Sequence, residues 1–147
     1  MRQACCAVAV LASALVSFHA TADDATDGLK AFQGSWDLIY FERDGKGVKL
    51  QNNTRIINTG DKFVVKRRNQ VIAAGTMKVD PSKKPKASET TYTQGPDKGK
   101  TFKGIYEFDG DTLRFCRAGS PDDERPTEFK TKPGSGRFMA AYKRSKQ

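Results

Sequence analysis

Histidine and cysteine are scarce in this sequence. Its 147 residues contain one His and three Cys. One histidine cannot supply the usual histidine-rich metal sites, and it leaves little for catalytic triads. Three cysteines are too few for a disulfide framework. The sequence also shows no phosphate-binding loop, nucleophile elbow or metal-ligand spacing. We therefore expect no enzyme activity, no metal and no cofactor.

Acidic residues are outnumbered by basic ones, 17 to 26, which gives a formal net charge of +9. The acids that stand close together lie in expected turns, as in Asp109-Gly110-Asp111 and Asp122-Asp123-Glu124. A calcium loop would need a further bidentate acid downstream of the first group, and none is placed there. We interpret these acids as turn residues that bond the backbone.

The first 22 residues differ in composition from the rest of the chain. Arg2 precedes an uncharged apolar run, Ala4–Phe18, and the small residues Ala20 and Ala22 stand just before Asp23. This order is typical of a secretory signal peptide. The alternative, a membrane anchor, is less favoured because a span needs roughly 20 apolar residues. We predict a signal peptide over 1–22, a secreted or periplasmic location, and no membrane span after cleavage.

Cleavage would leave one cysteine, Cys116, and no histidine. Because a lone cysteine cannot form an internal disulfide, we interpret Cys116 as a small buried apolar residue and leave any other role open. Residues 23–32 are expected to form a flexible segment, with a helical turn at most near Phe32. Residues 33–147 are expected to form one domain, since the length suits no second one.

After residue 33 the sequence alternates short strand patterns with turn residues. The clearest hairpin joins Phe102–Phe108 to Leu113–Arg117 through Asp109-Gly110-Asp111-Thr112. Its alternation predicts an apolar face and a mixed face. Eight such strands with short connections indicate an antiparallel sandwich or barrel. The expected strands are Gly34–Glu42, Thr54–Asn58, Phe63–Arg68, Val71–Val79, Ala87–Thr93, Phe102–Phe108, Leu113–Arg117 and Arg137–Arg144.

Gly34-Ser35-Trp36 opens the first strand and resembles the G-x-W motif of lipocalin-type barrels. The resemblance implies an all-β, antiparallel eight-stranded lipocalin-like (calycin-type) barrel in which Trp36 closes one end. It also implies that a basic residue of the last strand packs across the tryptophan. In such a barrel the last strand runs antiparallel beside the first, so we predict Arg144 for this place, with Lys143 as the alternative. Gly34, Trp36 and Arg144 are thus the predicted structural residues.

A closer resemblance covers about residues 33 to 144. Five blocks in order are similar to a lipocalin-like family of small exported proteins that is much multiplied in planctomycetes. The family implies a fold and an exported setting, but it implies no activity and no site residue. The blocks are Gln33–Trp36 with Glu42–Lys46, Asp80–Lys86, Gly104–Glu107 with Asp109–Leu113, Arg125–Phe129, and Lys132–Gly136.

Two functions remain open for such a barrel. One is the binding of a small apolar or amphipathic ligand inside it, and an internal cavity of roughly 300 Å³ or more would favour this function. The other is a protein- or surface-interaction module with a filled barrel, which an exposed apolar patch would favour. The predicted ligand-binding residues are Tyr40, Tyr106, Phe108, Leu113 and Phe115.

Two basic runs, Lys66-Arg67-Arg68 and Lys83-Lys84-Pro85-Lys86, raise the question of partners. Aromatic strands with a positive charge also occur in nucleic-acid-binding folds. Because the signal peptide predicts export, we expect no nucleic-acid partner. Attraction to an acidic surface or to a protein partner is the expected consequence of the charge.

The expected cleavage can be tested on the exported protein. N-terminal sequencing should begin at Asp23, within two residues, because Ala20 and Ala22 occupy the two positions that a signal peptidase reads. Recovery of intact Met1 from the soluble exported fraction would contradict the prediction.

Overall fold

The structure is a computed structural model that describes residues 22–50 and 53–146. The predicted signal peptide, residues 1–22, therefore lies outside the described residues, except for Ala22. Within the described ranges, no helix is long and apolar enough to cross a membrane.

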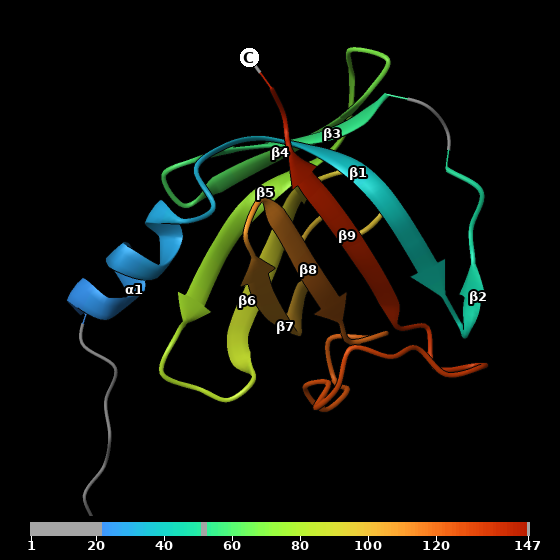
Figure 1. Cartoon of the computed structure of the whole chain (residues 1–147). Helices are drawn as coiled ribbons and strands as arrows, with labels where there is room; N and C mark the ends of the chain where they lie inside the picture. The colour runs from blue at the N-terminus through green and yellow to red at the C-terminus, as the bar shows by residue number, and fades with distance from the viewer. Residues whose placement is uncertain (1–21, 51–52, 147) are drawn as a thin grey trace, which may run out of the picture.

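One antiparallel sheet accounts for nearly the whole fold (Figure 1). Apart from β2, which flanks β1, the strand order follows the chain, and β1 also pairs with β9, so the sheet closes into a barrel. The eight predicted strands are all present, and the predicted all-β, eight-stranded barrel is confirmed; the two-residue β2 is an addition beside β1. The elements are α1 (Ala22–Lys30), β1 (Gly34–Arg43), β2 (Lys46–Gly47), β3 (Thr54–Thr59), β4 (Lys62–Arg67), β5 (Gln70–Asp80), β6 (Lys86–Gln94), β7 (Thr101–Asp109), β8 (Thr112–Arg117) and β9 (Phe138–Arg144).

The segment 23–32 differs from the expected flexible one, because most of it is the helix α1, which lies against β5 (Figure 1). Leu29 packs on the barrel core, and Phe32, just after the helix, is buried within it. Gly28 permits a close approach, since a Cβ there would lie 2.9 Å from Cγ2 of Val79. A nine-residue helix is marginal alone, so packing rather than local sequence stabilises it.

Trp36 is fully buried at the end of the barrel that α1 covers. Its indole Nε1 donates a hydrogen bond to the carbonyl of Phe32 at 2.7 Å, and Asn58 Nδ2 donates to the same carbonyl at 3.1 Å. The Phe32 ring meets Tyr106 and Phe108 edge to face, with centroids 4.8 and 4.9 Å away. Phe32 and Trp36 together close this end.

Arg144 completes the closure, as the strand order predicted. It pairs with Trp36 in the β1–β9 register, and its guanidinium carbon lies 4.1 Å from the indole centroid. Its two terminal nitrogens donate to the carbonyls of Gln33 (2.9 Å) and Ala31 (3.1 Å). Gly34 adopts φ +97°, which favours glycine, where the chain turns from the helix into β1.

A β-bulge in β1, between Leu38 and Tyr40, reverses the alternation of the strand. The prediction that Tyr40 lines the lumen is therefore wrong. Its side chain is 41% exposed, and its hydroxyl donates to Glu42 at 2.6 Å on the outside. Strict alternation from Trp36 would place Phe41 and Arg43 on the outside. Beyond the bulge both side chains instead point inward.

The long segment between β8 and β9 covers part of the outer wall. Cys116 and Ile105, on the outward face of the β7–β8 hairpin, are completely buried beneath it. The Cys116 thiol donates to the carbonyl of Lys130 at 3.8 Å, and burial raises the pKa of this thiol. Cys116 is thus a small buried residue, as predicted.

The closed end yields a stability prediction. Replacing Trp36→Ala should lower the free energy of unfolding by about 3–5 kcal/mol, as for other large buried aromatics. Because Trp36 is the chain's only tryptophan, the measurement is chemical denaturation followed by circular dichroism. An unchanged denaturation midpoint would show that the barrel does not depend on this ring.

Candidate functional site

The lumen of the barrel is largely filled by its own side chains. The internal cavity that remains is about 60 Å³, and its walls include Phe63, Leu113, Phe115 and Tyr142. Such a space admits a few water molecules but is far below the ~300 Å³ at which small-molecule sites begin. The deep lumen therefore cannot take an organic ligand without repacking.

The predicted ligand-binding residues are divided by the structure. Leu113 and Phe115 border the small cavity. Tyr106 and Phe108 instead pack with Phe32 in the closed end, where burial raises the pKa of Tyr106 to about 12. With Tyr40 outside, the five residues do not form one site.

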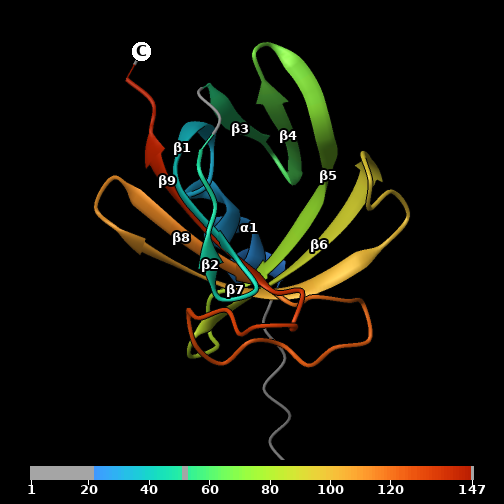
Figure 2. The ribbon, with the colours of Figure 1, turned by 90° about the vertical axis from the view of Figure 1, so that its right-hand side faces the viewer.

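A larger hollow, which we call the cup, lies at the other end of the barrel. Its volume is about 700 Å³. It forms because β1 pairs with β3 only over Gly34–Asp37, so the remainder of β1 diverges from β3 and β4. Figure 2 shows β8 and β9 on one side of the barrel and β5 and β6 on the other. The apolar lining of the cup includes Leu38, Phe41, Val48, Leu50, Val65, Ile72 and Phe138.

A buried arginine forms part of the cup's lining. Arg117 ends β8 on the same inward alternation as Leu113 and Phe115, and it is only 4% exposed. Its Nη1 donates to Oδ2 of Asp97 at 3.0 Å. Its guanidinium carbon lies 3.7 Å from the Phe102 ring centroid and 4.5 Å from that of Phe138. The charge is held in one place by an ion pair and two ring faces.

Two further arginines line the cup from its exposed side. Arg43 extends over Phe41 and Phe138, with its guanidinium carbon 5.8 and 5.9 Å from the two ring centroids. Arg67 ends β4 and is exposed. Among residues 22–50 and 53–146, neither guanidinium has a carboxylate within 4 Å. Both therefore remain available to an anion from solution.

The cup also contains two tyrosines, Tyr92 and Tyr142. Burial raises the pKa of Tyr92 and that of Tyr142. Both hydroxyls are therefore neutral at ordinary pH, so they add polar groups but no negative charge. The cup combines an apolar wall, neutral hydroxyls and an excess of cations.

Sequence reasoning missed the residues of the cup because they come from seven different strands and the loops between them. One signal was present: an arginine, Arg117, continues the otherwise apolar alternation of Leu113 and Phe115. A charged residue on a core-facing position is rare without a partner or a function. Arg43 carried no such signal, because its orientation depends on the bulge in β1.

Comparison of the chain with family models, with curated proteins and with solved structures finds no match. The family resemblance of the sequence blocks therefore stays a prediction, and the site rests on geometry alone. Within the described residues, no group of three or more His, Cys, Asp or Glu side chains could hold a metal ion.

Loss of the Asp97 charge should destabilise the fold around the cup. Asp97→Asn leaves the buried Arg117 guanidinium without its counter-charge, so we expect a loss of about 1–3 kcal/mol in the free energy of unfolding. Urea denaturation of the variant measures it. Asp122→Asn, on an exposed loop, is the control and should change stability by no more than about 0.5 kcal/mol. Equal stabilities for the two variants would contradict the role given to Asp97.

Proposed function

We propose that this protein binds a small amphipathic molecule with an anionic head group in the cup, after export from the cytoplasm, and that it acts as a binder and not as an enzyme. The observation that carries the proposal is the cup itself. About 700 Å³ of mostly apolar space lies beside two guanidinium groups, those of Arg43 and Arg67, that have no carboxylate within 4 Å among the described residues. The signal-peptide pattern supports the exported setting.

The volume of the cup supports a ligand of modest size. Small-molecule sites typically measure about 300–1,000 Å³. Because the lumen beneath is filled, the apolar part of the ligand would lie across Leu38, Ile72 and Phe138 and would not descend toward Trp36. A short or bent apolar group therefore fits better than a long straight chain.

The cations support an anionic head group, and their type favours a carboxylate. A guanidinium presents a planar fork that can bond both oxygens of a carboxylate. Arg43 and Arg67 are free to provide this fork. Arg117 would contribute less net charge, because it is already paired with Asp97, but its buried Nε has no hydrogen-bond partner among the described residues.

The alternative, an interaction module that uses the outer wall, has weaker support. The large apolar side chains that are most exposed are Ile39, Tyr40, Val48 and Val71. Ile39 and Tyr40 are adjacent at the bulge of β1, whereas Val48 lines the cup and Val71 lies near the start of β5. Scattered apolar exposure of this kind is normal for a protein surface.

A titration with a matched pair of probes tests the proposal. The first probe is a medium-chain carboxylic acid that carries an environment-sensitive fluorophore, and the second is its methyl ester. We expect saturable one-to-one binding of the acid and binding of the ester weaker by about tenfold, since only the acid can pair with the guanidiniums. Absence of saturable binding of the acid would overturn the proposal.

Charge-matched variants separate the cup from general attraction. Arg43→Met with Arg67→Met should weaken binding of the acid by about tenfold. Arg55→Met with Lys66→Met removes the same charge from the outer wall of β3 and β4 and should leave binding unchanged. Equal weakening by both pairs would show that net charge, and not the cup, attracts the probe.

A further inference from the structure

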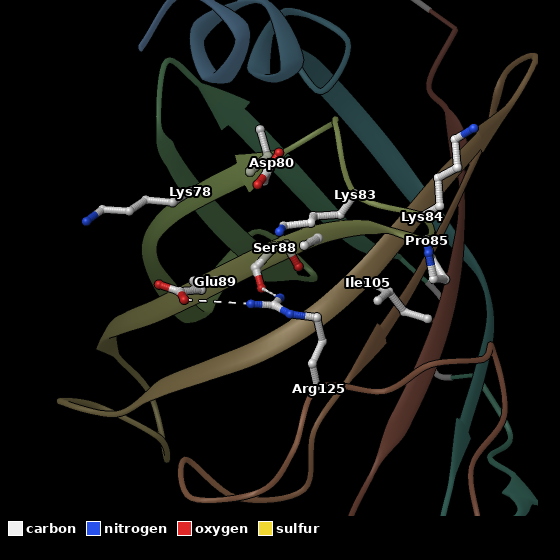
Figure 3. A pocket seen from close by; sticks show the side chains of 11 residues that line it. Lys78, Asp80, Lys83, Lys84, Pro85, Ser88, Glu89, Ile105 and Arg125 are labelled. Carbon is white, nitrogen blue, oxygen red and sulfur yellow. Dashed lines mark hydrogen bonds and ion pairs between the residues drawn. The ribbon is translucent and has the colours of Figure 1, made fainter. Parts of the chain in front are cut away.

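A second hollow, which we call the side hollow, lies on the outer wall of the barrel (Figure 3). Its volume is about 360 Å³. One wall is the connector between β5 and β6, which contributes Lys83, Lys84 and Pro85. The opposite wall is Arg125, from the long segment between β8 and β9. The proposed function makes no use of this hollow.

The connector is held in place at its start. Oδ1 of Asp80 accepts hydrogen bonds from the backbone N of Ser82 at 3.0 Å and from its hydroxyl at 2.5 Å. Pro81 lies against Gly28 of α1, where a Cβ would come within 3.3 Å of the proline ring. These contacts fix the point from which Lys83 and Lys84 project, so the wall exists before any ligand binds.

Arg125 is held on the other wall by the barrel backbone. Its Nη1 donates to the carbonyls of Ser88 (2.5 Å) and Gly104 (2.7 Å), which belong to the adjacent strands β6 and β7. Its Nη2 lies 3.7 Å from Oε1 of Glu89, a long and partly exposed ion pair. The guanidinium therefore keeps a fixed position beside the hollow.

Cations converge on the side hollow from both walls. Figure 3 shows the Lys83 ammonium and the Arg125 guanidinium both reaching the neighbourhood of Ser88, whereas Lys78 and Lys84 extend outward at the two ends. Like charges brought together repel each other unless an anion lies between them. Two carboxylates also line the hollow: Glu89 pairs with Arg125, and Asp80 bonds Ser82 while the charges of Lys83 and Arg125 help to lower its pKa. Four cations, those of Lys78, Lys83, Lys84 and Arg125, still outnumber these two anions in the lining.

The floor of the side hollow is apolar. Ala87 and Ile105 are buried there, and Val79 and Pro85 add to the lining. The lysines alone do not account for this apolar floor, because solvated lysine side chains do not require apolar residues beneath them. The combination suits a molecule with a compact apolar part and a strongly charged group.

We propose that the side hollow is a second binding site, for a phosphate monoester, with Lys83 and Arg125 as the residues that contact the phosphate. A phosphate monoester carries close to two negative charges at neutral pH and three acceptor oxygens. Lysine pairs with such a group as a point charge and does not need the planar geometry of a carboxylate. Lys78 and Lys84 add positive potential at the rim.

The test uses phenyl phosphate, followed by the backbone amide signals of isotopically labelled full-length protein. We expect saturable shifts that centre on Ala87, Glu89 and Ile105. Binding should strengthen from pH 5 to pH 7, because the phosphate loses its second proton near pH 6. Phenyl sulfate, which stays a monoanion, should bind several-fold more weakly. Shifts that do not saturate, or that centre elsewhere, would overturn the proposal.

Two variants complete the test. Lys83→Gln should weaken binding of phenyl phosphate by about fivefold, whereas Lys66→Gln, on the outer wall of β4, should not change it. If both variants weakened the binding of phenyl phosphate equally, net charge alone would explain the effect, and the proposed site would be wrong. The cup variant Arg43→Met with Arg67→Met should leave the shifts at Ala87 and Ile105 intact, so failure of one site does not imply failure of the other.

Discussion

The fold depends first on the pairing of β1 with β9. It closes the sheet, leaves the barrel without a long free edge, and brings Trp36 beneath Arg144. Phe32 then enters the barrel from the covering helix and meets Trp36, Tyr106 and Phe108. Because an eight-stranded barrel has room for either side chains or one small ligand, filling this end leaves usable space only at the other.

The bulge in β1 decides what lines that other end. Without the extra residue, Tyr40 would face the lumen, as Trp36 does, and Arg43 would face solvent. With it, Tyr40 bonds Glu42 outside, while Phe41 and Arg43 line the cup. One inserted residue thus removes a hydroxyl from the interior and places a cation at the mouth.

The strands could be read from the sequence because alternation and turn residues are local signals. The hairpin register of Tyr106 with Phe115 and the partnership of Trp36 with Arg144 followed from them. The helix α1 could not be read, because its stability comes from contacts with β5 that lie far away in sequence. The cup could not be predicted either, since seven strands contribute to its lining and only Arg117 stood at an unusual position in the sequence. Alternation also misled at Tyr40, because a bulge leaves no clear mark in one sequence.

The two hollows differ in how their cations are held, and this difference should govern what each can select. In the cup, Arg117 is fixed by Asp97 and by two aromatic rings, whereas Arg43 and Arg67 are exposed and must lose side-chain freedom when they bind. In the side hollow the backbone fixes Arg125, and only Lys83 has to be ordered. A fixed charge costs little to use but tolerates little change in ligand shape, while a free guanidinium adapts to its partner at an entropic cost. Under the two proposals, the cup should therefore tolerate more variation in ligand shape than the side hollow does.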